Sequence, residues 1–379
     1  MAGQNKPMKQ LESFTIEQFR GLKGLELQGL GRVNLLFGLN NSGKTTVLEA
    51  LSCFAKPLDG MHWLSVALQR FGVFPRGSRV QALKWLFPQQ SDSSPNLLYE
   101  GGKIIIRAKG ECPAVRCEAL LKEVVGMLAD DPHGGTDQLQ ELPDEEREEM
   151  KHRRGAQLHM EMQKKNGDAE KRQMTVWDER SLVRREIRQE DSFPMSFISL
   201  NEFRSDSRAA ARFSDVRRLG LYEEAMEVLR RLDPGVREML VLSGDRGFPL
   251  LHIDHSRTGL TPLSVCGDGM RRAVQIAFTV PSVKNGILLV DEIESALHVS
   301  VLTQVFELLV TACADHDVQL FATTHSLEAL DAMLGVALKN PKADLVSYRL
   351  EKNPEITSAV RLDEKTLAIV RNELGQEVR

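Results

Sequence analysis

The spacing of apolar residues predicts short strands and helices along the first third of the chain. Residues 13–19 alternate polar and apolar side chains, and residues 25–30 do so more loosely, which is typical of half-buried strands. Residues 33–37 are mostly apolar and predict a short buried strand. From 45 to 54 the apolar residues recur at helical spacing, and a further strand is predicted at 103–107 after a Gly-Gly turn. A strand, a loop and a helix therefore follow one another near the N-terminus.

The second half of the chain contains the pattern of a βαβ unit. Residues 287–290 are all apolar, as in strands that parallel sheets bury on both faces. Residues 318–322 form a second such run, and an amphipathic helix is predicted between them at 301–312. Such an order predicts an α/β fold with a mixed and parallel sheet flanked by helices.

Charged residues dominate the middle of the chain, from about residue 144 to 191, and aromatic residues become rare there. Glu149 with Arg153, and Glu161 with Lys165, are opposite charges four positions apart. This spacing brings side chains together on a helix surface and predicts exposed helix. A solvated helical insertion is the favoured interpretation, and a binding arm is the alternative.

These patterns divide the chain into three parts. Residues 1–125 and 195–379 form the two halves of one globular unit, and 126–194 form a charged helical insertion. Asn166-Gly167 would be the tip of a helical hairpin within the insertion. We therefore expect a deletion of residues 144–191 to leave a folded protein that has lost only its action on a partner.

Composition narrows the class of protein further. The chain has 379 residues, of which 42% are hydrophobic, so a sizeable core is possible and a wholly disordered chain is excluded. Its net charge of −4 excludes a protein that binds nucleic acid through overall positive charge. The five cysteines form no CxxC pair, which favours reduced thiols. The polar N-terminus and the absence of apolar runs of ~18 residues indicate a cytoplasmic protein without a membrane segment.

A phosphate-binding loop is predicted between the strand at 33–37 and the helix that begins near Thr45. The segment from Gly38 to Thr45 matches GxxxxGK[ST], in which glycines let backbone N–H groups converge on phosphate oxygens. Lys44 would reach the β- and γ-phosphates of ATP, and the Thr45 hydroxyl would ligate Mg²⁺. A glycine-rich turn that binds nothing is the alternative. The candidate nucleotide-binding residues here are Gly38, Asn40, Asn41, Ser42, Gly43, Lys44, Thr45 and Thr46.

Polar residues follow both strands of the βαβ unit. Asp291 and Glu292 come directly after the strand at 287–290, and the carboxyl ends of parallel strands are where open α/β sheets bind ligands. Asp291 would hold Mg²⁺, and Glu292 would orient and polarise the water that attacks the γ-phosphate. His325 follows the neighbouring strand and could contact the γ-phosphate and sense its loss. A hydrophilic strand end and a structural histidine are the alternatives.

Together these motifs resemble the ABC-type ATPase heads of the SMC, RecF and OLD group. Residues 263–272, LSVCGDGMRR, occupy the place of the signature motif of that group, and 291–298, DEIESALH, resemble its second acidic motif. Thr324-His325 is similar to the switch histidine of these heads. In the segment Phe19-Arg20-Gly21-Leu22, Arg20 corresponds to an arginine that faces the nucleotide in SMC-like heads.

The resemblance covers residues 12–55 and 195–335 and is strongest to small standalone bacterial members without a Toprim domain. It implies an ATPase that converts ATP and water into ADP and phosphate, with Glu292, Lys44 and His325 as its catalytic residues. The signature departs from Leu-Ser-Gly-Gly, and no glutamine can be placed as the Q-loop residue. The part of the signature expected to contact nucleotide is Gly267, Asp268 and Gly269.

Such heads hold each ATP between the phosphate loop of one copy and the signature of the other. The resemblance therefore implies a head-to-tail homodimer that ATP closes, a switch or clamp rather than a fast metabolic enzyme. The resemblance also implies a separate effector, such as a nuclease or a toxin. It further implies a role in DNA repair or anti-phage defence. The alternative from another class is a nucleotide-gated scaffold that binds ATP with little turnover and sequesters a toxin or effector.

DNA is a further candidate partner. Arg204, Arg208 and Arg212 share one helical face, and Arg217 and Arg218 follow. Such a stripe could follow the phosphates of DNA. Acidic residues interleave the stripe, which favours a solvated or salt-bridged face over a DNA-binding one.

The phosphate-loop interpretation gives a direct prediction. Lys44→Ala removes the cation that would neutralise the β- and γ-phosphates, so we expect the variant to lose nucleotide binding. Calorimetric titration with ATP measures this. Wild-type ATP affinity in the variant would contradict the assignment of the loop.

Overall fold

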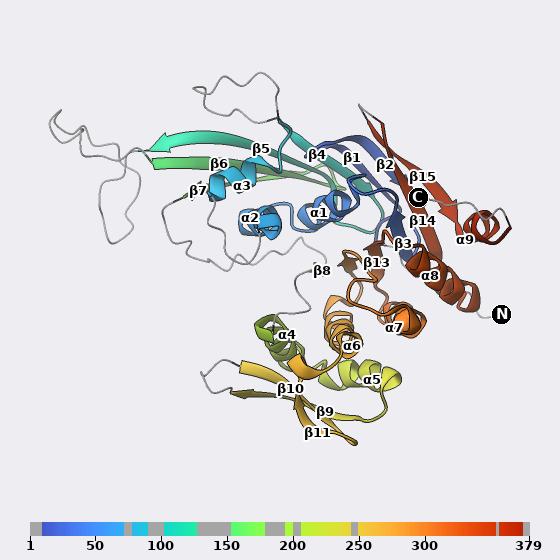
Figure 1. Cartoon of the computed structure of the whole chain (residues 1–379). Helices are drawn as coiled ribbons and strands as arrows, with labels where there is room; N and C mark the ends of the chain where they lie inside the picture. The colour runs from blue at the N-terminus through green and yellow to red at the C-terminus, as the bar shows by residue number, and fades with distance from the viewer. Residues whose placement is uncertain are drawn as a thin grey trace.

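The computed structural model describes most of the chain and is shown in Figure 1. The described residues are 10–71, 78–89, 102–126, 153–178, 194–199, 206–243, 249–353 and 356–373. None of the helices among them is long and apolar enough to cross a bilayer.

A six-stranded, mostly parallel sheet lies at the centre of the fold. Its strand order is β15-β14-β3-β13-β12-β8, and only β15 runs antiparallel to its neighbour. The strands are β3 (Val33–Phe37), β8 (Met195–Ile198), β12 (Ile287–Val290), β13 (Gln319–Thr323), β14 (Leu345–Lys352) and β15 (Thr357–Asp363). The predicted strands 33–37 and 287–290 are confirmed at both ends.

Both faces of this sheet are buried, which explains the continuous apolar runs. Neighbouring residues of one strand enter two different hydrophobic cores, as Leu36 and Leu35 of β3 do. The predicted βαβ unit is confirmed: β12 and β13 are adjacent and parallel, and α7 (Val299–Asp315) connects them. The expected mixed and parallel α/β fold is therefore the observed one.

Helices cover the two faces of the central sheet. Helix α1 lies between this sheet and the second large sheet, so the side chains of residues 46–55 are all buried. Helices α4 to α8 lie on the opposite face of the central sheet, where the second hydrophobic core lies (Figure 1). The helices are α1 (Lys44–Ala55), α2 (Gly60–Leu68), α3 (Arg79–Lys84), α4 (Asp206–Arg218), α5 (Tyr222–Leu232), α6 (Asp268–Thr279), α7, α8 (Leu327–Lys339) and α9 (Glu364–Ala368).

The second large sheet is antiparallel throughout, in the order β2-β1-β4-β5-β6-β7. Its strands are β1 (Ser13–Phe19), β2 (Leu22–Gln28), β4 (Ile104–Lys109), β5 (Ala114–Gly126), β6 (Arg153–Lys164) and β7 (Ala169–Trp177). A third sheet, β11-β10-β9, consists of β9 (Val236–Ser243), β10 (Pro249–His255) and β11 (Gly259–Pro262), and it leads into α6.

The prediction of helix in the charged insertion is wrong for its described part. Residues 153–177 form the hairpin of β6 and β7, which extends the antiparallel sheet beyond β5. Asn166 and Gly167 do form the tip, with Gly167 at a φ of 90°. Glu149 and the other residues of 127–152 and 179–193 lie outside the described residues.

The apolar residues of β6 show why the helical interpretation failed. Alternate residues of this strand are buried, with an exposed fraction of 0% for Leu158, and the set is Ala156, Leu158, Met160 and Met162. This period of two belongs to a strand. Glu161 pairs across the hairpin with Lys171, at 3.1 Å, rather than along a helix with Lys165. Deleting residues 144–191 would therefore remove two strands and part of a core, and we no longer expect a folded product.

The hairpin gives a prediction about stability. Leu158→Ala removes a fully buried side chain, so we expect it to lower the free energy of unfolding by about 2–5 kcal/mol. Gln173→Ala, an exposed change on the neighbouring strand, is the control and should alter it by less than about 0.5 kcal/mol. Urea denaturation measures both. An equally small effect of the two changes would contradict the inclusion of the hairpin in the core.

Candidate functional site

The loop from Gly38 to Thr45 connects β3 to α1 in a conformation that its glycines allow. Gly38 and Gly43 have φ of 138° and 97°, values that L side chains rarely adopt. A Cβ at Gly38 would come within 2.6 Å of the Leu350 carbonyl oxygen, and one at Gly43 within 2.8 Å of Leu22 Cδ2. Larger residues are thus excluded by space as well as by backbone conformation.

Two side chains of the loop lack the partners that a phosphate would supply. Ser42 Oγ is buried and has no hydrogen-bond partner among the described residues. Lys44 Nζ instead donates to the carbonyl oxygens of Gly38 and Leu39, each at 2.9 Å. Burial lowers the pKa of Lys44, against the opposing effect of Asp291 and Glu292. A phosphate group within the loop would satisfy both side chains.

Asp291 connects the loop to the two strands of the βαβ unit. Thr45 Oγ1 donates to both carboxylate oxygens of Asp291, at 3.0 and 3.1 Å. Thr323 Oγ1, at the end of β13, donates to Asp291 Oδ1 at 2.6 Å and accepts a hydrogen bond from the Glu292 N–H at 2.8 Å. Residues 246 positions apart in sequence therefore share one cluster.

This cluster fits a magnesium site. Mg²⁺ prefers oxygen ligands, and in nucleotide sites it takes one or two from the protein and the rest from phosphates and water. Asp291 is 5% exposed and makes no ion pair within the described part of the chain. A buried carboxylate next to a hydroxyl, without a cationic side chain bonded to it, is a suitable place for a divalent cation.

Glu292 and His325 lie at the ends of adjacent strands, as expected. Glu292 has a φ of 42°, and its side chain is 36% exposed. Burial raises the pKa of Glu292, with Asp291 and Glu294 adding to the rise. His325 Nδ1 is 3.9 Å from Glu292 Oε1 but only 3.2 Å from Glu294 Oε1. The same Glu294 oxygen accepts a hydrogen bond from the backbone N–H of His325.

Glu294 is the site residue that the sequence reasoning did not include. Its second carboxylate oxygen is buried without a hydrogen-bond partner among the described residues. The repeated acid in Asp291-Glu292-Ile293-Glu294 was the signal that could have identified it. Thr323 was missed as well, although a polar residue ends an otherwise apolar strand there.

Arg20 does not contact the loop. Its Nε lies 2.9 Å from Glu49 Oε2, and Nη1 donates to the Trp85 carbonyl oxygen. Arg70 donates to both carboxylate oxygens of Glu49 and to Thr46 Oγ1, the latter at 3.0 Å. Arg70 is therefore the arginine that contacts a residue of the predicted nucleotide set, and the role of Arg20 at the nucleotide stays a prediction.

The signature residues lie apart from the phosphate loop of the same chain. Gly267 precedes α6, and Asp268 and Gly269 form its first turn. Among the described residues, no hydrogen bond or ion pair connects these three with residues 38–45. A Cβ at Gly269 would lie 4.0 Å from Val301 Cγ2 of α7, so this helix start rests on the start of α7.

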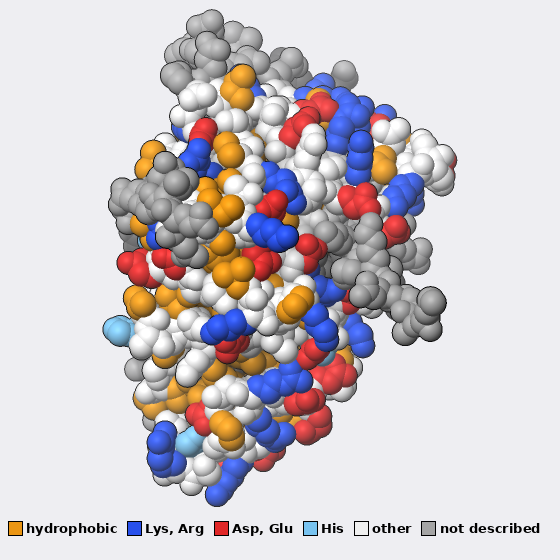
Figure 2. Space-filling model, turned by 90° about the vertical axis from the view of Figure 1, so that its right-hand side faces the viewer, with side chains coloured by type: hydrophobic (Ala, Val, Ile, Leu, Met, Phe, Trp, Pro, Cys, Tyr) orange, Lys and Arg blue, Asp and Glu red, His pale blue; other side chains and the backbone are white. Residues whose placement is uncertain are grey.

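The arginines of α4 form no continuous stripe. Arg212 donates to Ser196 and Thr279, Arg218 pairs with Asp215 at 2.6 Å, and Arg217 lies over a tyrosine ring. Arg204 lies outside the described residues. On another side of the molecule, shown in Figure 2, basic and acidic side chains are interspersed as well. These pairings favour the salt-bridged interpretation over a DNA-binding stripe.

The comparison with protein families identifies the chain. Residues 134–331, about half of the chain, match the family described as "AAA domain, putative AbiEii toxin, Type IV TA system". The chain belongs to this family. The matched segment contains the signature region, Asp291, Glu292 and His325, while the phosphate loop precedes it. With that loop, the chain is a P-loop NTPase domain of the AbiEii-type AAA family.

Two relatives come from Methanocaldococcus jannaschii. The uncharacterized protein MJECL11 is 32% identical over 113 residues, which are 30% of this chain and 98% of that protein. The uncharacterized protein MJECL10 is 40% identical over 50 residues, or 13% of this chain, and the match covers only 23% of that protein.

Solved structures similar to the AbiEii-type domain include two SMC heads. The SMC head domain from Thermotoga maritima is 14% identical, with a TM-score of 0.41 over 94% of this chain and 100% of that one. The Smc head domain with an extended coiled coil, bound to the C-terminal domain of ScpA, from Pyrococcus furiosus is 12% identical, with a TM-score of 0.43 over 97% and 99%. Values this low assign neither an activity nor a partner to this chain.

The environment of Glu292 predicts a pH-dependent stability. A raised carboxyl pKa means that the folded protein holds the proton more tightly, so ionisation of Glu292 at neutral pH destabilises the fold. Glu292→Gln cannot ionise, and we expect it to melt at a higher temperature than the wild type at neutral pH. The difference should disappear as the pH falls below ~4, where the unfolded carboxyl is protonated too. Differential scanning fluorimetry across this range tests the sign, and a difference that grew toward acidic pH would contradict it.

Proposed function

We propose that the chain is an ATPase that binds ATP with Mg²⁺ and acts as a nucleotide-driven switch or clamp. The observation that carries this proposal is the cluster of Thr45, Asp291 and Thr323, which places the start of the phosphate-loop helix against the acidic strand end. A glycine-rich turn without a ligand does not require a buried carboxylate to be held at its helix.

The residues of the phosphate loop would hold the triphosphate. Lys44 would exchange the carbonyl oxygens of Gly38 and Leu39 for the β- and γ-phosphates. Ser42 Oγ and the backbone N–H groups of residues 38–46 would donate further hydrogen bonds, with Asn40 and Asn41 at the exposed rim. The first turn of α1 adds favourable partial charge for the anion.

Hydrolysis would depend on Glu292. Mg²⁺, held by Thr45 and Asp291, supplies charge stabilisation on the phosphates when bound. Glu292, whose pKa burial raises, would accept a hydrogen bond from the attacking water and orient it. His325, held by Glu294, lies beside Glu292 and would donate a hydrogen bond to the γ-phosphate.

Closure would require a second copy of the chain. Gly267, Asp268 and Gly269 make no bond to the phosphate loop of their own chain, and this separation supports a head-to-tail homodimer with ATP between loop and signature. Two bound γ-phosphates would stabilise the closed dimer, and their release would open it. A larger assembly of such dimers is compatible with the same geometry.

The biological setting is proposed on the family match. The family description names a putative toxin of a type IV toxin–antitoxin system, which supports a cytoplasmic role in anti-phage defence or, as for the SMC-like heads it resembles, DNA repair. The nucleotide state of the dimer would then control a separate effector protein, a nuclease or a toxin. DNA remains a candidate ligand, but no continuous basic stripe among the described residues favours it.

One observation favours the alternative of a scaffold with little turnover. Asp268 places a carboxylate in the first turn of α6, where the resemblance places the γ-phosphate of the partner. Like charges repel, so this residue would weaken closure. A scaffold of this kind would bind ATP, hold a toxin or effector inactive and release it when the dimer changes.

Glu292→Gln separates the two functions. The amide cannot act as a base, so an ATPase should keep ATP binding but lose at least about 100-fold in the rate of phosphate release, with an ATP-trapped dimer accumulating. Glu307→Gln, an exposed change on α7, is the matched control and should release phosphate at the wild-type rate. A phosphate-release assay and sedimentation velocity with ATP measure both effects. Turnover that is already absent in the wild type would favour the scaffold, and unchanged turnover in Glu292→Gln would remove this residue from the reaction.

A further inference from the structure

Two arginines share one buried carboxylate beside the start of α1. Glu49, in the second turn of that helix, is only 1% exposed. Arg20, in the turn between β1 and β2, has its Nε 2.9 Å from Glu49 Oε2. Arg70 lies in the short helix Gln69–Phe71 that follows α2. Its Nε donates to Glu49 Oε1 at 2.7 Å, and its Nη2 donates to Glu49 Oε2 at 2.8 Å. Two positive charges and one negative charge leave this trio with a net positive charge.

One nitrogen of the Arg70 guanidinium is left without a protein partner. Nη2 also donates to Thr46 Oγ1, at 3.0 Å, so the printed bonds use Nε and Nη2. Nη1 carries two more N–H donors and has no hydrogen-bond or ion-pair partner among the described residues. The Arg70 side chain is 46% exposed, whereas that of Glu49 is buried. A cation that is held at a fixed place therefore has unused donors next to Thr46.

Thr46 belongs to the part of α1 that would face the phosphates. The helix begins at Lys44, and the N–H groups of a first turn have no acceptor within their helix. The Val47 N–H donates to the Gly43 carbonyl oxygen at 3.0 Å, but the Thr46 N–H makes no such bond within the described part of the chain. In the proposed complex, Lys44 takes the β- and γ-phosphates, and Mg²⁺ on Thr45 bridges the same two. The α-phosphate is the group that remains for Thr46.

The charges around Arg70 favour an anion at this place. Burial lowers the pKa of Arg20, Glu49 opposes the fall, and the positive charge of Arg70 adds to it. Two cations on one carboxylate repel each other, and an anion bound at Arg70 would relieve this repulsion. Donors that are fixed before a ligand arrives also lose little conformational freedom when it binds.

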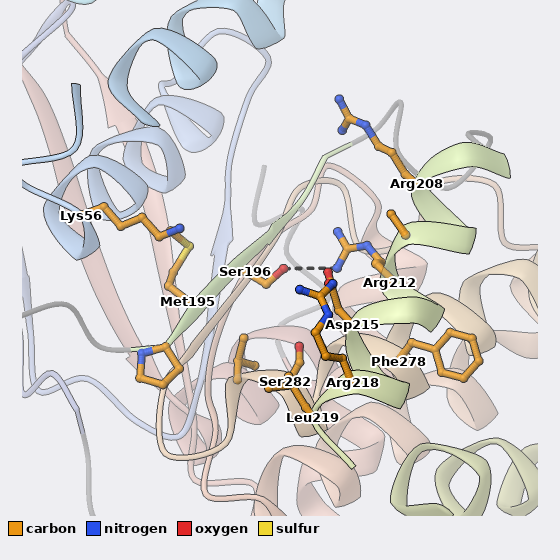
Figure 3. A pocket seen from close by; sticks show the side chains of 13 residues that line it. Lys56, Met195, Ser196, Arg208, Arg212, Asp215, Arg218, Leu219, Phe278 and Ser282 are labelled. Atoms are coloured by element: carbon orange, nitrogen blue, oxygen red, sulfur yellow. Dashed lines mark hydrogen bonds and ion pairs between the residues drawn. The ribbon is translucent and has the colours of Figure 1, made fainter. Parts of the chain in front are cut away.

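The arginines of α4 differ from Arg70 in this respect. Arg212 donates to Ser196 Oγ and Thr279 Oγ1 in the pocket that Figure 3 shows, and it has further partners. Arg218 is paired with a carboxylate of its own helix. The guanidinium groups of that pocket are thus engaged with the protein, so the stronger candidate for binding a phosphate is Arg70.

We propose that Arg70 is a further nucleotide-binding residue, whose Nη1 donates to the α-phosphate of ATP or ADP. This role rests on the proposed function, because it needs a nucleotide on the phosphate loop. Hydrogen bonds from a guanidinium to a phosphate are strengthened by the charges of both groups. Arg20 would act through Glu49, by holding the carboxylate that fixes Arg70, so the arginine that touches the nucleotide is Arg70.

Arg70→Met removes the cation and keeps an apolar stem. We expect the affinities for ATP and for ADP, each with Mg²⁺, to fall by the same factor of at least about ten, because both nucleotides carry the α-phosphate. The loss should shrink as salt is raised from about 0.05 M to about 0.5 M, because salt screens the half-exposed charge. Calorimetric titration of the full-length chain measures the affinities.

Two further variants complete the test. Arg107→Met removes an arginine that is likewise half-exposed and paired with a glutamate, so it is the matched control and should leave both affinities unchanged. Glu49→Gln removes a negative charge and keeps both arginines, so a direct contact of Arg70 with phosphate predicts an ADP affinity at least as high as in the wild type. Circular dichroism verifies that each variant is folded.

Four results would overturn the role of Arg70. They are wild-type affinities in Arg70→Met, a loss that is confined to ATP, a loss that does not change with salt, and an equal loss in Glu49→Gln, which would indicate that Arg70 only supports α1. Failure of the proposed function is recognised separately. A wild-type chain that binds neither nucleotide would overturn both, whereas binding that is lost in Lys44→Ala and kept in Arg70→Met would overturn only the role of Arg70.

Discussion

The site depends on one buried carboxylate. Asp291 is almost fully removed from water, and two threonine hydroxyls, one from α1 and one from β13, donate to it. Neutral hydrogen bonds offset only part of the cost of burying a charge. A divalent cation at the same place would offset the rest, so the cluster that organises the loop is also a suitable place for a cation. Lys44 and Glu292 are positioned around this cluster.

Helix α1 connects the nucleotide site to both large sheets. This helix is buried on all sides between the two large sheets, so it can shift only together with its neighbours. It carries the phosphate loop at one end and Lys56 at the other. Helix α6 likewise begins at the signature and ends at Thr279. A change in the position of either helix would therefore reach both ends of the central sheet.

The sequence predicted the parts of the fold that local patterns determine. The strands at 33–37 and 287–290 were recognisable because burial on both faces makes every residue apolar, and the phosphate loop because its glycines have no substitute. The hairpin at 153–177 was misread because charges at i,i+4 were given more weight than apolar residues at i,i+2. The contact of Arg20 with Glu49 and the place of Arg70 could not be predicted, because partners distant in sequence determine them.

The most direct test of the account is the dependence of ATP affinity on Mg²⁺, in the wild type and in Asp291→Asn. The amide keeps the size of the side chain and one oxygen that can accept from the two threonine hydroxyls, but it loses the charge. We predict that Mg²⁺ strengthens ATP binding to the wild type about tenfold or more, and that Asp291→Asn binds ATP with nearly the same affinity whether Mg²⁺ is present or not. Calorimetric titrations with and without Mg²⁺ measure both. An equal strengthening by Mg²⁺ in the two proteins would contradict the role of the buried carboxylate.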